Sequence, residues 1–120
     1  MDKKENSFTI VKLSSLDEDV LTALIGREMY GLGLLDKLNL GRPIELGFGS
    51  LYPALNRLNK RGLITWRWGD ETEETGGARR KYYRVTALGE HNLKAVQYYR
   101  QQLALPPQLG FRGFLGEVRV

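Results

Sequence analysis

The sequence predicts a small, mainly α-helical domain that carries one two-stranded β hairpin. Apolar residues recur at three- and four-residue spacing in four stretches, a pattern typical of amphipathic helices. Between the third and fourth stretches, two runs rich in Trp, Tyr, Val and Ile alternate as β-strands do. The chain of 120 residues is near the usual size of one domain, so a single hydrophobic core is expected.

Composition excludes several classes of protein. The chain has no Cys and a single His, His91, which excludes a disulfide framework, thiolate metal sites and thiol nucleophiles. No arrangement of residues indicates a catalytic triad, so neither enzymatic activity nor a cofactor nor a metal is expected. No apolar run is long enough for a membrane span or a signal peptide, and the sequence therefore predicts a soluble cytoplasmic protein without membrane contact.

Basic residues are concentrated in the second part of the chain. The net charge is only +4, but residues 1–45 carry 6 basic and 8 acidic side chains, whereas residues 46–120 carry 12 basic and 6 acidic ones. This asymmetry makes an anionic polymer such as nucleic acid a candidate partner.

Two helices are expected in the first part of the chain. Ser15 and Glu18 have the spacing of a capping box, in which each side chain bonds to a backbone amide of the other residue. A helix from about Leu16 to Arg27 should follow. After the interruption by Gly31 and Gly33, a run of leucines predicts a second, shorter helix that ends before residues 41–43.

A third helix is expected from the apolar positions Leu51, Leu55 and Leu58. Because proline fits only the first turn of a helix, Pro53 implies a start near Gly49 or Ser50. Gly62 marks the end of the helix. The side of the helix turned away from the core should present polar and basic residues, namely Tyr52, Asn56, Arg57 and Lys60.

A hairpin and a last helix complete the expected order. Residues 63–68 and 80–86 predict two strands, with Trp66 and Trp68 anchoring the hairpin to the helices. The loop between the strands is acidic over residues 70–74 and is expected to lie away from any bound phosphate. Thr86 should cap a final helix, which Pro106 and Pro107 cannot continue.

Three helices followed by a hairpin are the plan of a winged helix-turn-helix domain. The major groove of B-DNA is about 12 Å wide and admits one helix, while the phosphates beside it accept hydrogen bonds from Lys and Arg. Helix and hairpin supply eight such side chains, and double-stranded DNA is therefore the expected partner. They are Arg57, Lys60, Arg61, Arg67, Arg79, Arg80, Lys81 and Arg84.

Two sequence blocks stand out, Gly49-Ser50-Leu51-Tyr52-Pro53-Ala54-Leu55 and Gly77-Ala78-Arg79-Arg80-Lys81-Tyr82-Tyr83-Arg84-Val85-Thr86. Together they resemble the signature of the PadR-like transcriptional regulators, a family named for the phenolic acid decarboxylase repressor. The resemblance implies a winged helix joined to a C-terminal dimerising helix, and repression that a small molecule or another signal relieves. The implied DNA-binding residues are Ser50, Tyr52 and Pro53 at the start of the recognition helix, Asn56, Arg57 and Lys60 further along it, and Arg79, Arg80 and Lys81 in the wing.

The apolar stripe of the last helix has two interpretations. Leu93, Val96, Tyr99 and Leu103 could pack on the core of their own domain or form a dimer interface, and the family resemblance favours the interface. Two-fold symmetry would place two recognition helices about 34 Å apart on a pseudo-palindromic operator. A small-molecule effector would then have to lodge near this interface.

The sequence therefore predicts four segments in one homodimeric repressor. They are an N-terminal segment (1–14), the winged-helix domain (15–86), the dimerisation helix (87–105) and a tail rich in Gly and aromatic residues (106–120). The alternative is a winged-helix module that binds an acidic protein partner, because a fold does not by itself determine function.

Overall fold

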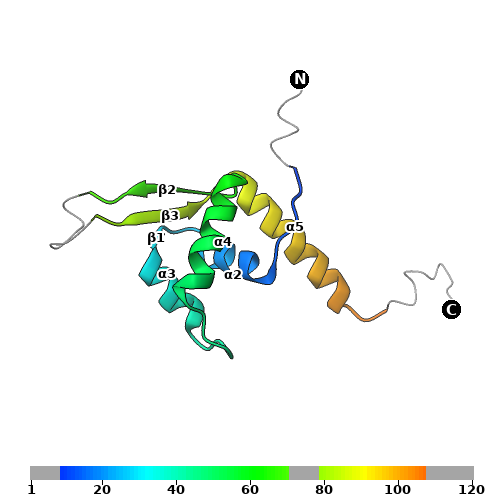
Figure 1. Cartoon of the computed structure of the whole chain (residues 1–120). Coiled ribbons are helices and arrows are strands. Elements are labelled where there is room, and N and C mark those ends of the chain that lie inside the picture. The colour runs from blue at the N-terminus through cyan, green and yellow to red at the C-terminus, as the bar shows by residue number, and fades with distance from the viewer. Residues whose placement is uncertain (1–8, 71–78, 108–120) are drawn as a thin grey trace, which may run out of the picture.

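The computed structural model describes residues 9–70 and 79–107. The helices pack beside one small antiparallel sheet (Figure 1). The tail beyond residue 107 and the acidic residues 71–74 lie outside this range. Within it, no helix combines the length and the apolar character needed to cross a membrane. The elements are α2 (Ser15–Leu24), β1 (Met29–Tyr30), α3 (Gly31–Asn39), α4 (Phe48–Lys60), β2 (Ile64–Trp68), β3 (Lys81–Val85) and α5 (Ala87–Ala104).

One hydrophobic core joins the three helices before the hairpin, as the leucine spacing predicts. The inward faces of α2, α3 and α4 bury their apolar side chains completely, and the start of β2 closes the core. Figure 1 shows the β2–β3 hairpin projecting from one side of this body and the end of α5 leaving on the other. The buried residues at the centre are Val20, Leu21, Leu24, Leu34, Leu51, Leu55, Leu58, Leu63 and Ile64.

The sheet has a third strand that the sequence analysis did not predict. β1 pairs with β3 through Met29 and Tyr83, so that β3 lies between β1 and β2. A strand of two residues is too short to show alternation, which explains why no pattern indicated it. Tyr83 faces the core and is buried, whereas Tyr82 is half-buried on the opposite face.

The capping box of α2 lies one residue earlier than predicted. The Ser14 hydroxyl accepts a hydrogen bond from the Asp17 amide at 3.0 Å, and the Asp17 carboxylate accepts one from the Ser14 amide at 3.0 Å. Glu18 is therefore not part of the cap. α2 also ends before Arg27, because Gly26 adopts a φ of +74° that cannot continue a helix.

The starts of α3 and α4 also differ from the prediction. Gly31 and Gly33 lie inside the first turn of α3 rather than before it. α4 begins at Phe48, which places Pro53 in its second turn. Proline there removes the amide that would bond to the carbonyl of Gly49. Gly49 and Pro53 are both exposed, so water can donate a hydrogen bond to the Gly49 carbonyl instead.

Only one of the two tryptophans anchors the hairpin. Trp66 is half-buried against the core, whereas Trp68 is 46% exposed near the far end of β2. The two rings still contact each other edge to face, with 5.4 Å between their centroids. Trp68 does not anchor the hairpin, because β2 leaves the helical body before it reaches this residue.

Gly89 allows α5 to pack closely on the sheet. Thr86 caps α5 as predicted, and its side chain accepts the Gly89 amide. A Cβ at Gly89 would collide with the Leu63 carbonyl and the Val85 side chain. We expect Gly89→Ala to lower the free energy of unfolding by about 3 kcal/mol, because the backbone cannot yield. Urea unfolding measures this loss.

Gly49→Ala is the matched control for that substitution. Gly49 lies in a helix as Gly89 does, but a Cβ there would meet no atom within 4 Å. Its replacement should leave stability unchanged or raise it by up to about 1 kcal/mol. Equal stability of the two variants would contradict the close packing of α5.

Candidate nucleic-acid interface

A groove of about 570 Å³ runs between the first half of α4 and the hairpin. Both structural units that were expected to contact DNA contribute to its walls. α4 supplies Tyr52 and Asn56, and the hairpin supplies Arg79, Arg80 and Lys81. The structure therefore brings predicted site residues from distant parts of the chain to one surface.

Aromatic and apolar residues that were not among the predicted site residues form the rest of this groove. Phe48 stacks on Tyr52 with 5.0 Å between ring centroids and 14° between planes. The spacing of four residues on one helix is a signal that could have identified this pair. The other additional lining residues are Tyr30, Gly31, Leu32, Trp68 and Tyr83.

Tyr52 holds its ring over the start of α3. A Cβ at Gly31 would collide with the Tyr52 hydroxyl, so glycine makes room for that ring. Tyr52 nevertheless remains 43% exposed, and Asn56 is exposed one turn further along α4. Tyr52 therefore presents part of its ring, and Asn56 its side chain, to solvent along the groove.

The hairpin cations rest on aromatic rings. Arg80 lies 4.5 Å from the centroid of Tyr30, and Lys81 lies 4.2 Å from that of Trp66. Arg79 lies 5.8 Å from the Trp68 centroid and donates to the Gly69 carbonyl at 3.2 Å. A ring holds a cation in place without neutralising its charge. The groove is therefore lined by three oriented positive charges.

The residues that line the groove include no Asp or Glu. The ionisable phenol of Tyr83 remains neutral, because burial, with a smaller contribution from Tyr52, raises its pKa above the usual 10.0. Within residues 9–70 and 79–107, no cluster of His, Cys, Asp and Glu could hold a metal ion. The groove combines positive charge, hydrogen-bonding groups and stacked rings.

Ser50, Pro53 and Lys60 are exposed on α4 but do not line the groove. Ser50 and Pro53 lie on the turns beside Tyr52, and Lys60 is the last residue of the helix. Their places are consistent with contacts to the flanks of a bound duplex, and those contacts remain a prediction.

Arg57 lies at the edge of the exposed face of α4, with 38% of its side chain exposed, and forms an ion pair within the domain. Its Nη2 donates to Oδ1 of Asp17 at 2.6 Å, and the Asp17 side chain is only 2% exposed. A buried carboxylate needs a counter-charge, and Arg57 supplies it. Arg57 is therefore engaged within the domain, and the DNA contact expected of it stays a prediction.

Two other basic residues of the predicted set are also engaged within the molecule. Arg61 donates to the Lys12 carbonyl at 3.0 Å. Arg67 forms a bidentate pair with Glu28, with Nη2 at 2.8 Å from Oε1 and Nε at 3.0 Å from Oε2. The positive face of the domain is consequently smaller than the count of basic residues suggests.

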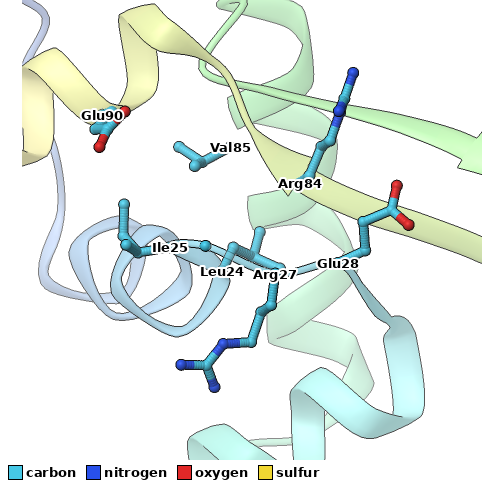
Figure 2. A pocket seen from close by; sticks show the side chains of 8 residues that line it. Leu24, Ile25, Arg27, Glu28, Arg84, Val85 and Glu90 are labelled. Atoms are coloured by element: carbon cyan, nitrogen blue, oxygen red, sulfur yellow. The ribbon is translucent and has the colours of Figure 1, made fainter.

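Arg84 lines a different pocket, of about 450 Å³, at the base of the hairpin (Figure 2). Residues 24–28, Val85 and Glu90 form its other walls. Figure 2 shows that the guanidinium groups of Arg27 and Arg84 point away from each other. Because two acidic residues balance them and their charges do not converge, this pocket lacks the features of a phosphate site.

The predicted dimer residues divide into two groups. Leu93 is 3% exposed and Val96 is half-buried, and both pack on the core of their own chain. Leu93 is thus a core residue, which corrects its prediction as an interface residue. The last turns of α5 instead expose Tyr98, Tyr99 and Leu103, each by more than half of its surface.

Three core helices followed by an antiparallel wing define a winged helix-turn-helix domain. The chain belongs to the PadR-like family of transcriptional regulators, whose family model matches residues 20–95. The resemblance seen in the two sequence blocks is therefore confirmed.

Solved structures of this family have the same fold. A PadR-like transcription factor from Bacteroides fragilis is 30% identical, with 73% of this chain and 82% of that chain covered and a TM-score of 0.65. A PadR family regulator from Eggerthella lenta is 34% identical, with 74% and 70% covered and a TM-score of 0.58. PadR of Bacillus subtilis, solved in complex with operator DNA, is 22% identical, with 81% and 51% covered and a TM-score of 0.56.

Proposed function

We propose that this protein is a sequence-specific DNA-binding regulator that acts as a homodimeric repressor. The groove between α4 and the hairpin carries this proposal, because it joins a helix with exposed polar side chains to three oriented cations. α4 would enter the major groove, and the hairpin would lie along the neighbouring phosphates. PadR of Bacillus subtilis, which has the same fold, was solved in complex with operator DNA, and this supports DNA as the partner.

Base reading would fall mainly to Asn56. An asparagine side chain can form two hydrogen bonds with the major-groove edge of adenine. Arg57, the one arginine of α4 that could read guanine, is held by Asp17. Phe48 and Tyr52 offer apolar ring edges next to Asn56, and such edges suit the methyl group of thymine. The recognition helix would therefore select A·T pairs.

Dimerisation would use the exposed end of α5. Tyr98, Tyr99 and Leu103 present apolar surface that the chain itself leaves uncovered. Pairing of these turns about a two-fold axis would place two copies of α4 about 34 Å apart, one for each half of a pseudo-palindromic operator. PadR of Bacillus subtilis was solved with operator DNA, and an operator is a repressor's site, which supports repression for this chain.

An effector would fit the groove of about 330 Å³ beside this interface. Residues 10–13 and α5 form the walls, with Val96 and Tyr99 among them. The groove is more apolar than the DNA-facing one and borders the proposed dimer contact. Its occupant would act by changing how the two protomers meet.

Asn56→Ala is expected to weaken binding to the preferred duplex by about 1 to 3 kcal/mol, because a bidentate base contact is lost. Affinity for a duplex of shuffled sequence should remain unchanged. The duplex is first selected from a random library with the wild-type protein, and fluorescence anisotropy then measures both affinities.

Asn59→Ala provides the control for this experiment. Asn59 is exposed on the same helix but lies outside the groove. It should bind both duplexes as the wild type does. If Asn56→Ala kept full preference for the selected duplex, or if Asn59→Ala lost it, the proposed orientation of α4 would be wrong.

A further inference from the structure

The recognition helix and the proposed dimerisation helix pack mainly on other elements. α5 packs on α2 and β3, whereas α4 packs on α2, α3 and β2. Their relative orientation must therefore be transmitted by a third part of the chain. Two parts of the chain touch both helices through polar contacts. Gly62 and Leu63 join the end of α4 to Thr86 at the start of α5. Segment 9–18, which includes the first turn of α2, touches both helices further along.

Segment 9–18 is tied to α5 at two points. Asn92, which is 2% exposed, accepts the Val11 amide at 2.7 Å and donates to the Thr9 carbonyl at 3.0 Å. Two turns later, Arg100 forms a bidentate pair with Glu18, at 2.8 Å from Nη2 and 3.2 Å from Nε. These contacts span the middle and the last part of α5.

The same segment is tied to α4 at two other points. Asp17 pairs with Arg57, and the Lys12 carbonyl accepts a hydrogen bond from Arg61. The neighbouring residues Asp17 and Glu18 thus hold different helices, the first α4 and the second α5. The capping box fixes Asp17 further through Ser14.

We propose that segment 9–18 is a bracket that sets the position of α4 relative to α5. In a dimer joined through α5, the bracket would thereby fix the distance between the two recognition helices and so the half-site spacing that the protein reads. Asn92 and Glu18 are then positioning residues for DNA recognition, although neither contacts DNA. The spacing claim rests on the proposed function, whereas the bracket itself can be tested without DNA.

Spin labels can measure the bracket directly. The chain has no native Cys, so no other thiol would take up a label. Asn59→Cys on α4 and Gln101→Cys on α5 place one label on each helix, both at exposed positions. Dilution with unlabelled protein removes distances between protomers. The distance distribution should be narrow in the otherwise wild-type chain and clearly broader when Asn92→Ala is combined with Arg100→Gln. Each single substitution should have an intermediate effect.

Lys94→Gln is the matched control. It removes one positive charge from α5, as Arg100→Gln does, but Lys94 pairs with Glu90 on the same helix at 3.6 Å and bridges no elements. Its distribution should stay narrow. Glu18→Lys combined with Arg100→Glu exchanges the charges of the bridging pair. This variant should restore the narrow distribution that Arg100→Gln broadens. Its test does not depend on Asn92→Ala, and it therefore remains decisive if Asn92→Ala proves unstable.

Duplexes whose half-sites differ in spacing by one base pair test the consequence for DNA. A rigid dimer must deform DNA to read a wrong spacing, whereas a loosened one need not. The double variant should lose on the order of tenfold of the wild-type preference for the best spacing, with unchanged affinity for a single half-site.

The outcomes separate the two proposals. An unbroadened distribution in the double variant would overturn the bracket. A broadened distribution with the wild-type spacing preference intact would overturn the claim that the bracket sets the half-site spacing. A wild-type protein without any spacing preference would overturn the dimeric reading of DNA, and the label distances would still decide whether segment 9–18 positions α4.

Discussion

Alanine at Arg79, Arg80 and Lys81 together is expected to lower DNA affinity about a hundredfold or more at low salt. Each of these side chains lies over an aromatic ring that orients its charged group, and each lines the groove. The slope of log affinity against log salt should become less steep by about 2 to 3, because each lost phosphate contact removes nearly one released counterion. Titrations at several salt concentrations measure both effects.

A variant with Ala at Arg27, Arg84 and Lys94 controls for the loss of charge. These residues are exposed and lie outside the groove between α4 and the hairpin. The control removes as much positive charge as the hairpin variant but should retain most of the affinity and of the salt slope. Equal losses in the two variants would mean that net charge, rather than the groove, accounts for binding.

Replacing Arg57 by Met should lower the free energy of unfolding by about 2 to 3 kcal/mol, because it leaves the buried Asp17 carboxylate without its counter-charge. Arg57 is itself 38% exposed, so the loss should fall below that of a fully buried pair. Lys60→Met, on the exposed end of the same helix, should change stability by less than about 0.5 kcal/mol. Urea denaturation compares the two variants.

The two substitutions should affect DNA affinity in the opposite order to their effect on stability. Fully folded Arg57→Met protein should keep its affinity for a duplex, whereas Lys60→Met should lose a contact if α4 lies in the major groove. An Arg57→Met protein of normal stability and reduced DNA affinity would restore Arg57 to the DNA-binding face and contradict the role that the structure assigns to it.

Local patterns predicted most of the fold, because regular spacing and caps act over short distances. The leucine spacing of α4 and the Thr86 cap of α5 are examples, and both are confirmed. The start of α2 could not be placed to the residue, since Ser14 with Asp17 and Ser15 with Glu18 fit the same capping pattern. Only the folded backbone shows which serine lies outside the helix.

The candidate site was predictable only in part, because some of its features are tertiary contacts. Tyr52 and Arg80 were found from helix spacing and local charge. The ion pair that engages Arg57 depends on Asp17, which lies 40 positions away along the chain. The burial of Leu93 likewise depends on how closely α5 packs, which Gly89 allows and no periodicity indicates.

A nitrogen-15 NMR titration tests most directly whether the groove between α4 and the hairpin binds DNA. The selected duplex is added to the labelled protein, and the shift of every backbone amide is followed. The amides of Tyr52, Asn56 and residues 79–81 should change most, and those around the pocket at the base of the hairpin should change little. Changes centred on Ile25 and Glu90, with residues 79–81 unaffected, would contradict the proposed interface.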